Sequence, residues 1–164
     1  MTTPDFSQSL LDLDVFVLSN LALNVRRRLT ERLAERGMNR WDVAVLAVLV
    51  DHGPTVQRAA ASLLGVDPSD MVDMVERLVN AGWVERERDP SDRRRYILTL
   101  TPQGREMFEL AGQEERRLRE ALLAPLDARE REEWRALLHL LHGHLRAGGL
   151  DAPPPAAGTA EPEP

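Results

Sequence analysis

The stretch Arg86–Leu100, which reads RERDPSDRRRYILTL, decides the fold. Its Asp-Pro-Ser-Asp segment, residues 89–92, has the composition of a tight turn, and Tyr96–Leu100 has the β-branched, aromatic and aliphatic residues of a strand. Three consecutive arginines at the tip of such a hairpin repel one another unless an anion lies against them. A hairpin tip is narrow enough to enter the minor groove of DNA, where arginine is favoured. The stretch therefore predicts a DNA-contacting hairpin, and a charged, solvated hairpin is the alternative.

A helix-turn-helix is predicted immediately upstream of this hairpin. The pattern indicates a short helix over residues 55–64, a turn at Gly65-Val66 and a second helix over residues 68–80 that ends before Gly82. Helix, glycine-containing turn, second helix and hairpin, in this order, form a winged helix-turn-helix.

These segments resemble the MarR (multiple antibiotic resistance regulator) family of transcription factors, over roughly residues 10–145. The matching stretches are Leu64–Ser69, Val75–Leu78, Ala81–Val84, Asp89–Arg94 and Leu98–Gly104. The resemblance implies a mainly α (α+β) fold, a winged helix-turn-helix with flanking dimerisation helices. It also implies a homodimer that regulates transcription, most often as a repressor, from a pseudo-palindromic operator in double-stranded DNA. Half-sites about one helical turn apart, roughly 10 bp, are then expected.

The flanking segments are predicted to be helical and to mediate dimerisation. Residues 5–36 read as one long helix whose apolar residues spread over more of its circumference than one core needs. Asn39 is predicted to cap a helix over residues 40–50, Thr101-Pro102 begins another, and Asp127 caps the last, which has an apolar face. We expect dimerisation helices at residues 5–36 and 102–147, a winged domain at residues 37–101 and a disordered tail at residues 148–164. A monomeric bundle that buries these leucines internally is the alternative.

Composition restricts the function. The 164 residues have a net charge of −6, but residues 86–95 alone contain five arginines, so the charge is segregated. The sequence has no cysteine, no apolar run of membrane-spanning length, and no basic leader, so we expect a cytoplasmic protein without membrane contact. It has no nucleophile or phosphate-loop motif, which argues against an enzyme and against a cofactor. His139 and His142 have a spacing that can hold a metal, but surface histidines are the simpler interpretation, and no metal is expected.

In the hairpin, the resemblance implies that Arg94 enters the minor groove and that the Asp92 carboxylate orients its guanidinium. Arg93 and Arg95 are expected to contact phosphates, or one of them points back to the protein.

The second helix departs from the family pattern, because Asp70, Val72 and Asp73 stand where hydroxyl residues and an arginine are common. Either aspartate can accept a hydrogen bond from cytosine N4. Alternatively both are helix-start charges, and Asp73 pairs with Arg77. Ser69, Gln57 and Arg58 are then expected to contact phosphate or base edges, and Arg77 the DNA backbone or an internal salt bridge. This acidic helix also favours a second reading, a winged-helix module that binds a basic protein.

The resemblance also implies a small-molecule effector, phenolic or aromatic, bound between the dimerisation helices and the winged domain. The residues expected to line that crevice are Ser19, Leu23, Trp41, Val45 and Met107. Trp41 has the core as an alternative place.

Overall fold

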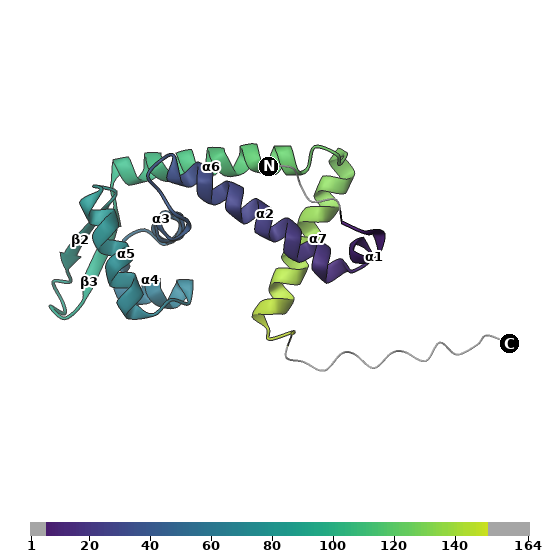
Figure 1. Ribbon diagram of the computed structural model, residues 1–164. Coiled ribbons are helices and arrows are strands. Elements are labelled where there is room, and N and C mark those ends of the chain that lie inside the picture. Colours follow the sequence, from purple (N-terminus) through teal and green to yellow (C-terminus); the bar gives the residue numbers. More distant parts are fainter. Residues whose placement is uncertain (1–5, 151–164) are drawn as a thin grey trace. The chain divides into compact units, whose positions relative to one another are not determined.

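The computed structural model describes residues 6–150, in which seven helices and three strands follow one another (Figure 1). Their bounds are α1 Gln8–Leu11, α2 Asp14–Ala34, α3 Arg40–His52, β1 Thr55–Val56, α4 Gln57–Leu64, α5 Pro68–Asn80, β2 Val84–Arg88, β3 Tyr96–Leu100, α6 Pro102–Leu122 and α7 Ala128–Arg146. The chain divides into two compact units, residues 1–121 and residues 122–164. The order α4, α5, β2, β3 confirms the predicted winged helix-turn-helix in a mainly helical fold. Within the described residues, none of the helices combines the length and apolar character of a membrane span.

The predicted caps of α3 and α7 are confirmed. The Asn39 side chain accepts hydrogen bonds from the backbone N–H groups of Trp41 at 2.7 Å and Asp42 at 3.1 Å, and an Asp42 oxygen accepts the Asn39 N–H. Asp127 and Glu130 form the same reciprocal pair at the start of α7. Each pair satisfies backbone donors that a helix start leaves free.

At the N-terminal side, the structure has two helices where the sequence predicts one over residues 5–36. The chain leaves helical geometry at Leu13, which has φ −97° and ψ 93°, and Asp14 then begins α2. Aspartate is disfavoured in helix interiors and favoured in the first turn, so Asp12 and Asp14 promote a new start. The rings of Phe6 and Phe16 meet edge to face at 5.0 Å across the break. Residue 5, and residues 151–164 of the tail predicted over residues 148–164, lie outside the described residues. Residues 148–150 form a turn after α7, in which the Gly149 N–H donates to the His144 carbonyl at 3.0 Å.

A small antiparallel sheet has the strand order β1-β3-β2. β2 and β3 form the predicted hairpin, with Val84 opposite Leu100 and Arg88 opposite Tyr96. β1 was not predicted: Thr55 and Val56, expected to begin a helix, pair instead with Leu98 and Ile97. Both are β-branched residues that favour extended backbone, and helix α4 therefore begins only at Gln57.

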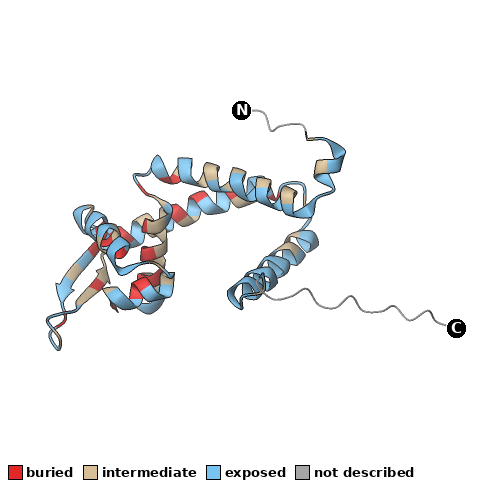
Figure 2. Ribbon diagram, turned by 60° about the horizontal axis from the view of Figure 1, so that its bottom comes forward, coloured by how far each residue is buried: buried red, intermediate tan, exposed pale blue. Residues whose placement is uncertain are grey.

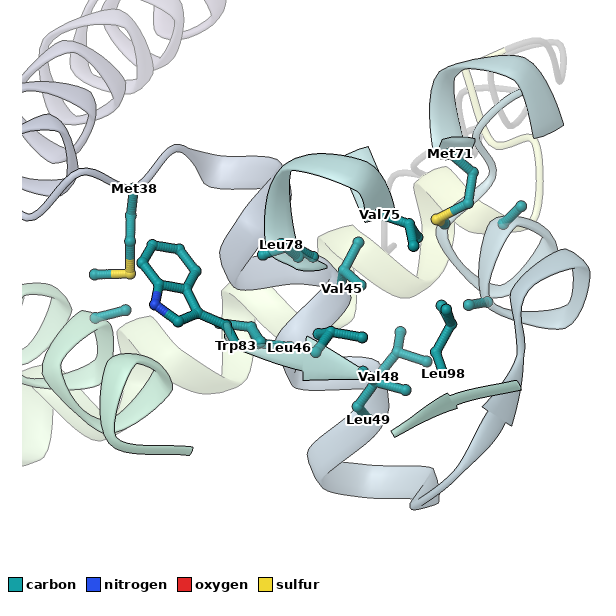
Figure 3. Packing of buried hydrophobic residues seen from close by; sticks show 14 of the residues in the cluster. Met38, Val45, Leu46, Val48, Leu49, Met71, Val75, Leu78, Trp83 and Leu98 are labelled. Atoms are coloured by element: carbon teal, nitrogen blue, oxygen red, sulfur yellow. The ribbon is translucent and has the colours of Figure 1, made fainter. Parts of the chain in front are cut away.

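The core of the first unit fixes which face of α5 points outward. Met71, Val75 and Leu78 of α5 are fully buried. They pack in one cluster with apolar residues of α3 and β3, among them Val45, Leu46, Leu49 and Leu98 (Figure 3). The opposite face of α5, with Ser69, Asp73, Glu76 and Asn80, is exposed.

The start of α6 is tied to the beginning of the hairpin. The Thr101 N–H donates to the Trp83 carbonyl at 3.1 Å, and the Thr101 hydroxyl donates to the Gly82 carbonyl at 2.8 Å. The same hydroxyl oxygen accepts the Gly104 N–H at 2.9 Å, which confirms the predicted Thr101 cap. The first turn of α6 is thereby held against the winged region.

Candidate nucleic-acid interface

The turn between α4 and α5 is built from local hydrogen bonds. Gly65 adopts the left-handed conformation, φ 64° and ψ 32°, that ends α4, which an L side chain rarely adopts. Asp67 caps α5 by accepting the Ser69 N–H at 2.8 Å and the Ser69 hydroxyl. These hydrogen bonds favour the ionised form and lower the pKa of Asp67. The direction of α5 is thus fixed at its first residue.

A second contact fixes α5 near its other end. The Arg77 guanidinium pairs with Asp42 of α3, whose side chain is fully buried. The other Asp42 oxygen accepts the Asn39 N–H at 2.7 Å, so both oxygens of this carboxylate have partners. Of the two roles left open for Arg77, the structure therefore shows the internal salt bridge. The alternative pairing of Asp73 with Arg77 is wrong, because Arg77 reaches Asp42 instead.

The hairpin between β2 and β3 is the wing, and its tip has an ordered turn. Asp89 is buried and accepts the Ser91 N–H at 2.8 Å and the Ser91 hydroxyl at 2.6 Å, which lowers the pKa of Asp89. The Asp89 N–H donates to the Arg95 carbonyl at 3.1 Å, which closes the loop. The arginines between them are presented at a defined place.

The resemblance implied that Asp92 orients the guanidinium of Arg94, but in the structure Asp92 does not contact that guanidinium. Its Oδ1 accepts only the backbone N–H of Arg94, at 3.0 Å, and its Oδ2 pairs with Nε of Arg95 at 3.0 Å. Arg95 is therefore the arginine that turns back to the protein. Arg93 and Arg94 are exposed, and within residues 6–150 neither guanidinium has an ion pair. These two remain available to an anion.

A groove with a volume of about 1130 Å³ lies between α4, the start of α5 and the wing. It brings together five of the predicted site residues, Gln57, Arg58, Asp92, Arg94 and Arg95. The other predicted residues, Ser69, Asp70, Asp73, Arg77 and Arg93, do not line it. Four arginines and one aspartate give this groove a cationic wall, which suits a polyanion.

Sequence reasoning missed two residues of this groove, Arg86 and Tyr96. The Arg86 guanidinium lies 3.9 Å from the centroid of the Tyr96 ring, and Arg88 lies 5.1 Å from it. Arg86 Nε and Gln57 Oε1 are buried without a hydrogen-bond partner in the described part of the chain. The signal for this stack was the Arg-x-Arg spacing on β2 opposite an aromatic residue on β3, which are neighbours once the hairpin register is known.

The residues expected to line an effector crevice have different environments. Val45 is fully buried in the core, so it has no surface to offer a ligand. Met107 packs against that core, and Leu23 is 62% exposed. The Ser19 hydroxyl donates to the Val15 carbonyl of its own helix. Trp41 is half-buried, and the Arg40 guanidinium lies 4.4 Å from the centroid of its ring.

Among residues 6–150, no group of three or more histidines, cysteines or carboxylates is arranged to hold a metal ion.

Comparison with known proteins agrees with this geometry. A family model described as MarR family matches residues 36–95. The repressor NicR of Pseudomonas putida is 34% identical over 96 residues, which are 58% of this chain and 59% of NicR. This chain thus spans about three fifths of that relative's own length.

Solved structures extend the similarity over more of the chain. A probable transcriptional regulator from Pseudomonas aeruginosa is 30% identical, with a TM-score of 0.66, over 79% of this chain and 97% of its own. The regulator PcaV of Streptomyces coelicolor, solved with its natural ligand, is 26% identical, with a TM-score of 0.66, over 87% of this chain and 98% of its own. These proteins are transcription regulators and not enzymes.

Proposed function

Because this chain belongs to the MarR family of DNA-binding transcription regulators, we propose that it represses transcription as a homodimer on a pseudo-palindromic operator. The observation that supports this most directly is the groove lined by Arg58, Arg86, Arg94 and Arg95 between the helix-turn-helix and the wing. In the proposed complex, α5 enters the major groove and the wing tip enters the adjacent minor groove. We assign to contacts with phosphates or base edges, close to α5 and the wing, the side chains of Ser69, Gln57 and Arg93.

Arg94→Ala tests the wing assignment. Removal of one guanidinium from a phosphate-rich contact is expected to weaken binding to every duplex and to lower the slope of log affinity against log salt by about 1. Fluorescence anisotropy with a mixed-sequence duplex at several salt concentrations measures both quantities. The matched control is Arg129→Ala, which removes an exposed arginine of α7 that pairs with Glu133 and is expected to leave the slope unchanged.

Wild-type protein that shows no salt-dependent binding to DNA at low salt would contradict the proposed function. That result would favour the second candidate, a winged-helix module that binds a basic protein through Asp70, Asp73 and Glu76. All three are exposed on α5.

The proposed dimer explains apolar side chains that the single chain leaves exposed. α7 has no buried residue, and most of it is drawn in the colour of exposed residues in Figure 2. Its leucines Leu137, Leu138, Leu140, Leu141 and Leu145 are each at least 42% exposed. On α2, Val15, Leu18, Leu21 and Leu23 are exposed as well. Apolar surface of this extent usually marks an interface, so we assign residues 5–36 and 102–147 to dimerisation.

Leu141→Glu is expected to convert the dimer into a monomer, because a carboxylate in an apolar interface loses its hydration without gaining a partner. Sedimentation equilibrium at micromolar concentration measures the change. His139→Glu introduces the same charge at an exposed polar position of α7 and is expected to leave the mass unchanged. A wild-type chain that sediments as a monomer would contradict the dimer.

Release from DNA by a small aromatic or phenolic carboxylate is the regulatory step that we propose. The stack of Arg40 on the half-buried Trp41 offers a planar apolar face and a cation to such a ligand. An effector acts only through different affinities for the bound and the free conformation. Titration of the protein–DNA complex with 4-hydroxybenzoate tests the class, and Trp41→Ala is expected to abolish any release. If aromatic carboxylates neither bind the protein nor release it from DNA, this step is contradicted.

A further inference from the structure

The outward ridge of α5 has no cation that is free to meet a phosphate. Ser69, Asp73, Glu76 and Asn80 follow one another at spacings of three and four residues, and all four are exposed. This ridge lies opposite the buried Met71, Val75 and Leu78. The single arginine of α5, Arg77, is engaged by the buried Asp42.

Among the acidic residues of this region, Asp73 and Glu76 have no part in starting the helix, and Asp73 is the one nearer the N-terminal end of α5, where a recognition helix contacts base edges. Asp67 is the cap of α5, and Asp70 lies in the first turn, where the helix dipole favours a negative charge. Asp73 lies beyond that turn, where the effect of the dipole has faded. Its neighbour one turn ahead, Arg77, pairs with Asp42, and the Asp73 carboxylate has no hydrogen bond or ion pair within residues 6–150. An unpaired carboxylate on a DNA-facing ridge weakens binding unless it contacts a donor.

The donors available to it are on base edges. An ionised carboxylate only accepts hydrogen bonds, and in the major groove cytosine N4 and adenine N6 are the donors. Adenine places its N7 acceptor beside N6, while guanine and thymine present acceptors, so cytosine fits a carboxylate best. The arginines that line the proposed DNA-binding groove lie on other elements, Arg58 on α4, Arg86 on β2 and Arg94 in the wing. Helix α5 is therefore free to contact base edges while the arginine-lined groove of the protein binds the DNA backbone.

We infer that Asp73 is a specificity-determining residue that selects cytosine at one position of each operator half-site. The inference rests on the proposed function, because it requires that α5 enter the major groove.

The test is selection of duplexes from a randomised DNA library by the full-length wild-type protein and by Asp73→Asn. An asparagine side chain hydrogen-bonds adenine N6 and N7 together, so the preference at a single position is expected to change from cytosine to adenine, by about tenfold or more. The matched control is Glu76→Gln, which removes the same charge from the same ridge one turn further along α5. It is expected to leave the selected motif unchanged. Both positions are exposed, so neither substitution is expected to change the stability of the fold. Thermal unfolding of the two variants and the wild type checks this.

A switch to adenine, or loss of the cytosine preference at that position alone, supports the inference. An unchanged motif for Asp73→Asn overturns it, as does equal tightening on all sequences by Asp73→Asn and Glu76→Gln, since the charge alone then explains both. The proposed function fails in a different way: the wild-type protein then selects no motif at all, and the inference fails with it.

Discussion

At Gly104 the first turn of α6 approaches the backbone of Trp83 so closely that no side chain fits. A Cβ on Gly104 would lie 2.0 Å from the Trp83 carbonyl oxygen and 2.9 Å from a Leu100 methyl carbon. The carbonyl oxygen accepts the Thr101 N–H, so it is not free to move. We therefore expect Gly104→Ala to lower the free energy of unfolding by about 1–3 kcal/mol, as overpacking of a tight contact does. Urea unfolding of the two proteins measures the difference.

Gly112 on the same helix is the matched control. The nearest atom to a Cβ there is the end of the Arg116 side chain, at 3.4 Å, and nothing rigid is in contact. Gly112→Ala should raise the free energy of unfolding by roughly 0.5–1 kcal/mol, because alanine is the better helix former. Two substitutions of the same kind on α6 are thus expected to have opposite signs. Equal effects would mean that the contact with Trp83 relaxes easily.

At the scale of elements, the pair of Asp42 and Arg77 joins α3 to α5 across the core. Arg77→Gln would leave a carboxylate that is fully buried without its charged partner. Because Arg77 itself is 45% exposed and solvent screens part of the interaction, we expect a loss of about 1–3 kcal/mol in the free energy of unfolding. Chemical denaturation measures this loss, and the affinity for DNA is expected to fall with it, since α5 is less firmly positioned.

A double-mutant cycle separates the pair from its surroundings. The combined variant Asp42→Asn/Arg77→Gln should be less destabilised than the sum of the single variants, because each substitution removes the same interaction. Additive losses would show that the two side chains act independently.

The elements that the sequence predicts well are those whose ends depend on local chemistry. The bounds of α5 follow from the Asp67 cap and Pro68, and those of β3 follow from the turn before it. β1 depends on pairing with β3, which lies far along the chain, and two residues give no periodicity to detect. The partner of Asp42 is 35 residues away in sequence. In the candidate site, the wing arginines were recognisable from composition. The choice of Asp92 between Arg94 and Arg95 is decided by the turn geometry, which composition does not specify.

At the scale of the whole molecule, ionised carboxylates with partners should make stability depend on acid. A hydrogen bond from Arg36 to Glu114, together with the charges of Arg117 and Arg32, lowers the pKa of Glu114 from its ordinary value of 4.5. These contacts link α6 with α2 and the residues after it. Hydrogen bonds from Ser69 and Ser91 lower the pKa values of Asp67 and Asp89 from 3.8. Asp67 lies in the turn between α4 and α5, Asp89 lies in the wing, and Glu114 lies where α6 contacts α2.

Because these pKa values are lower in the folded chain than in the unfolded chain, the unfolded state takes up protons first as the pH falls. The stability that they contribute is therefore fully present above pH 4.5 and is lost as the pH falls through the folded pKa values. We expect the free energy of unfolding, measured by denaturant titration, to decrease below about pH 4.5. Glu114→Gln is expected to lower stability at pH 7 and to converge towards the wild type in acid. Glu109→Gln, which alters an exposed residue of α6 that has no ion pair within residues 6–150, serves as the control for the loss of one carboxylate. If the difference in the free energy of unfolding between wild type and Glu114→Gln stayed constant down to pH 3, the prediction would be wrong. The contribution of Glu114 to stability would then not depend on the charge of its carboxylate.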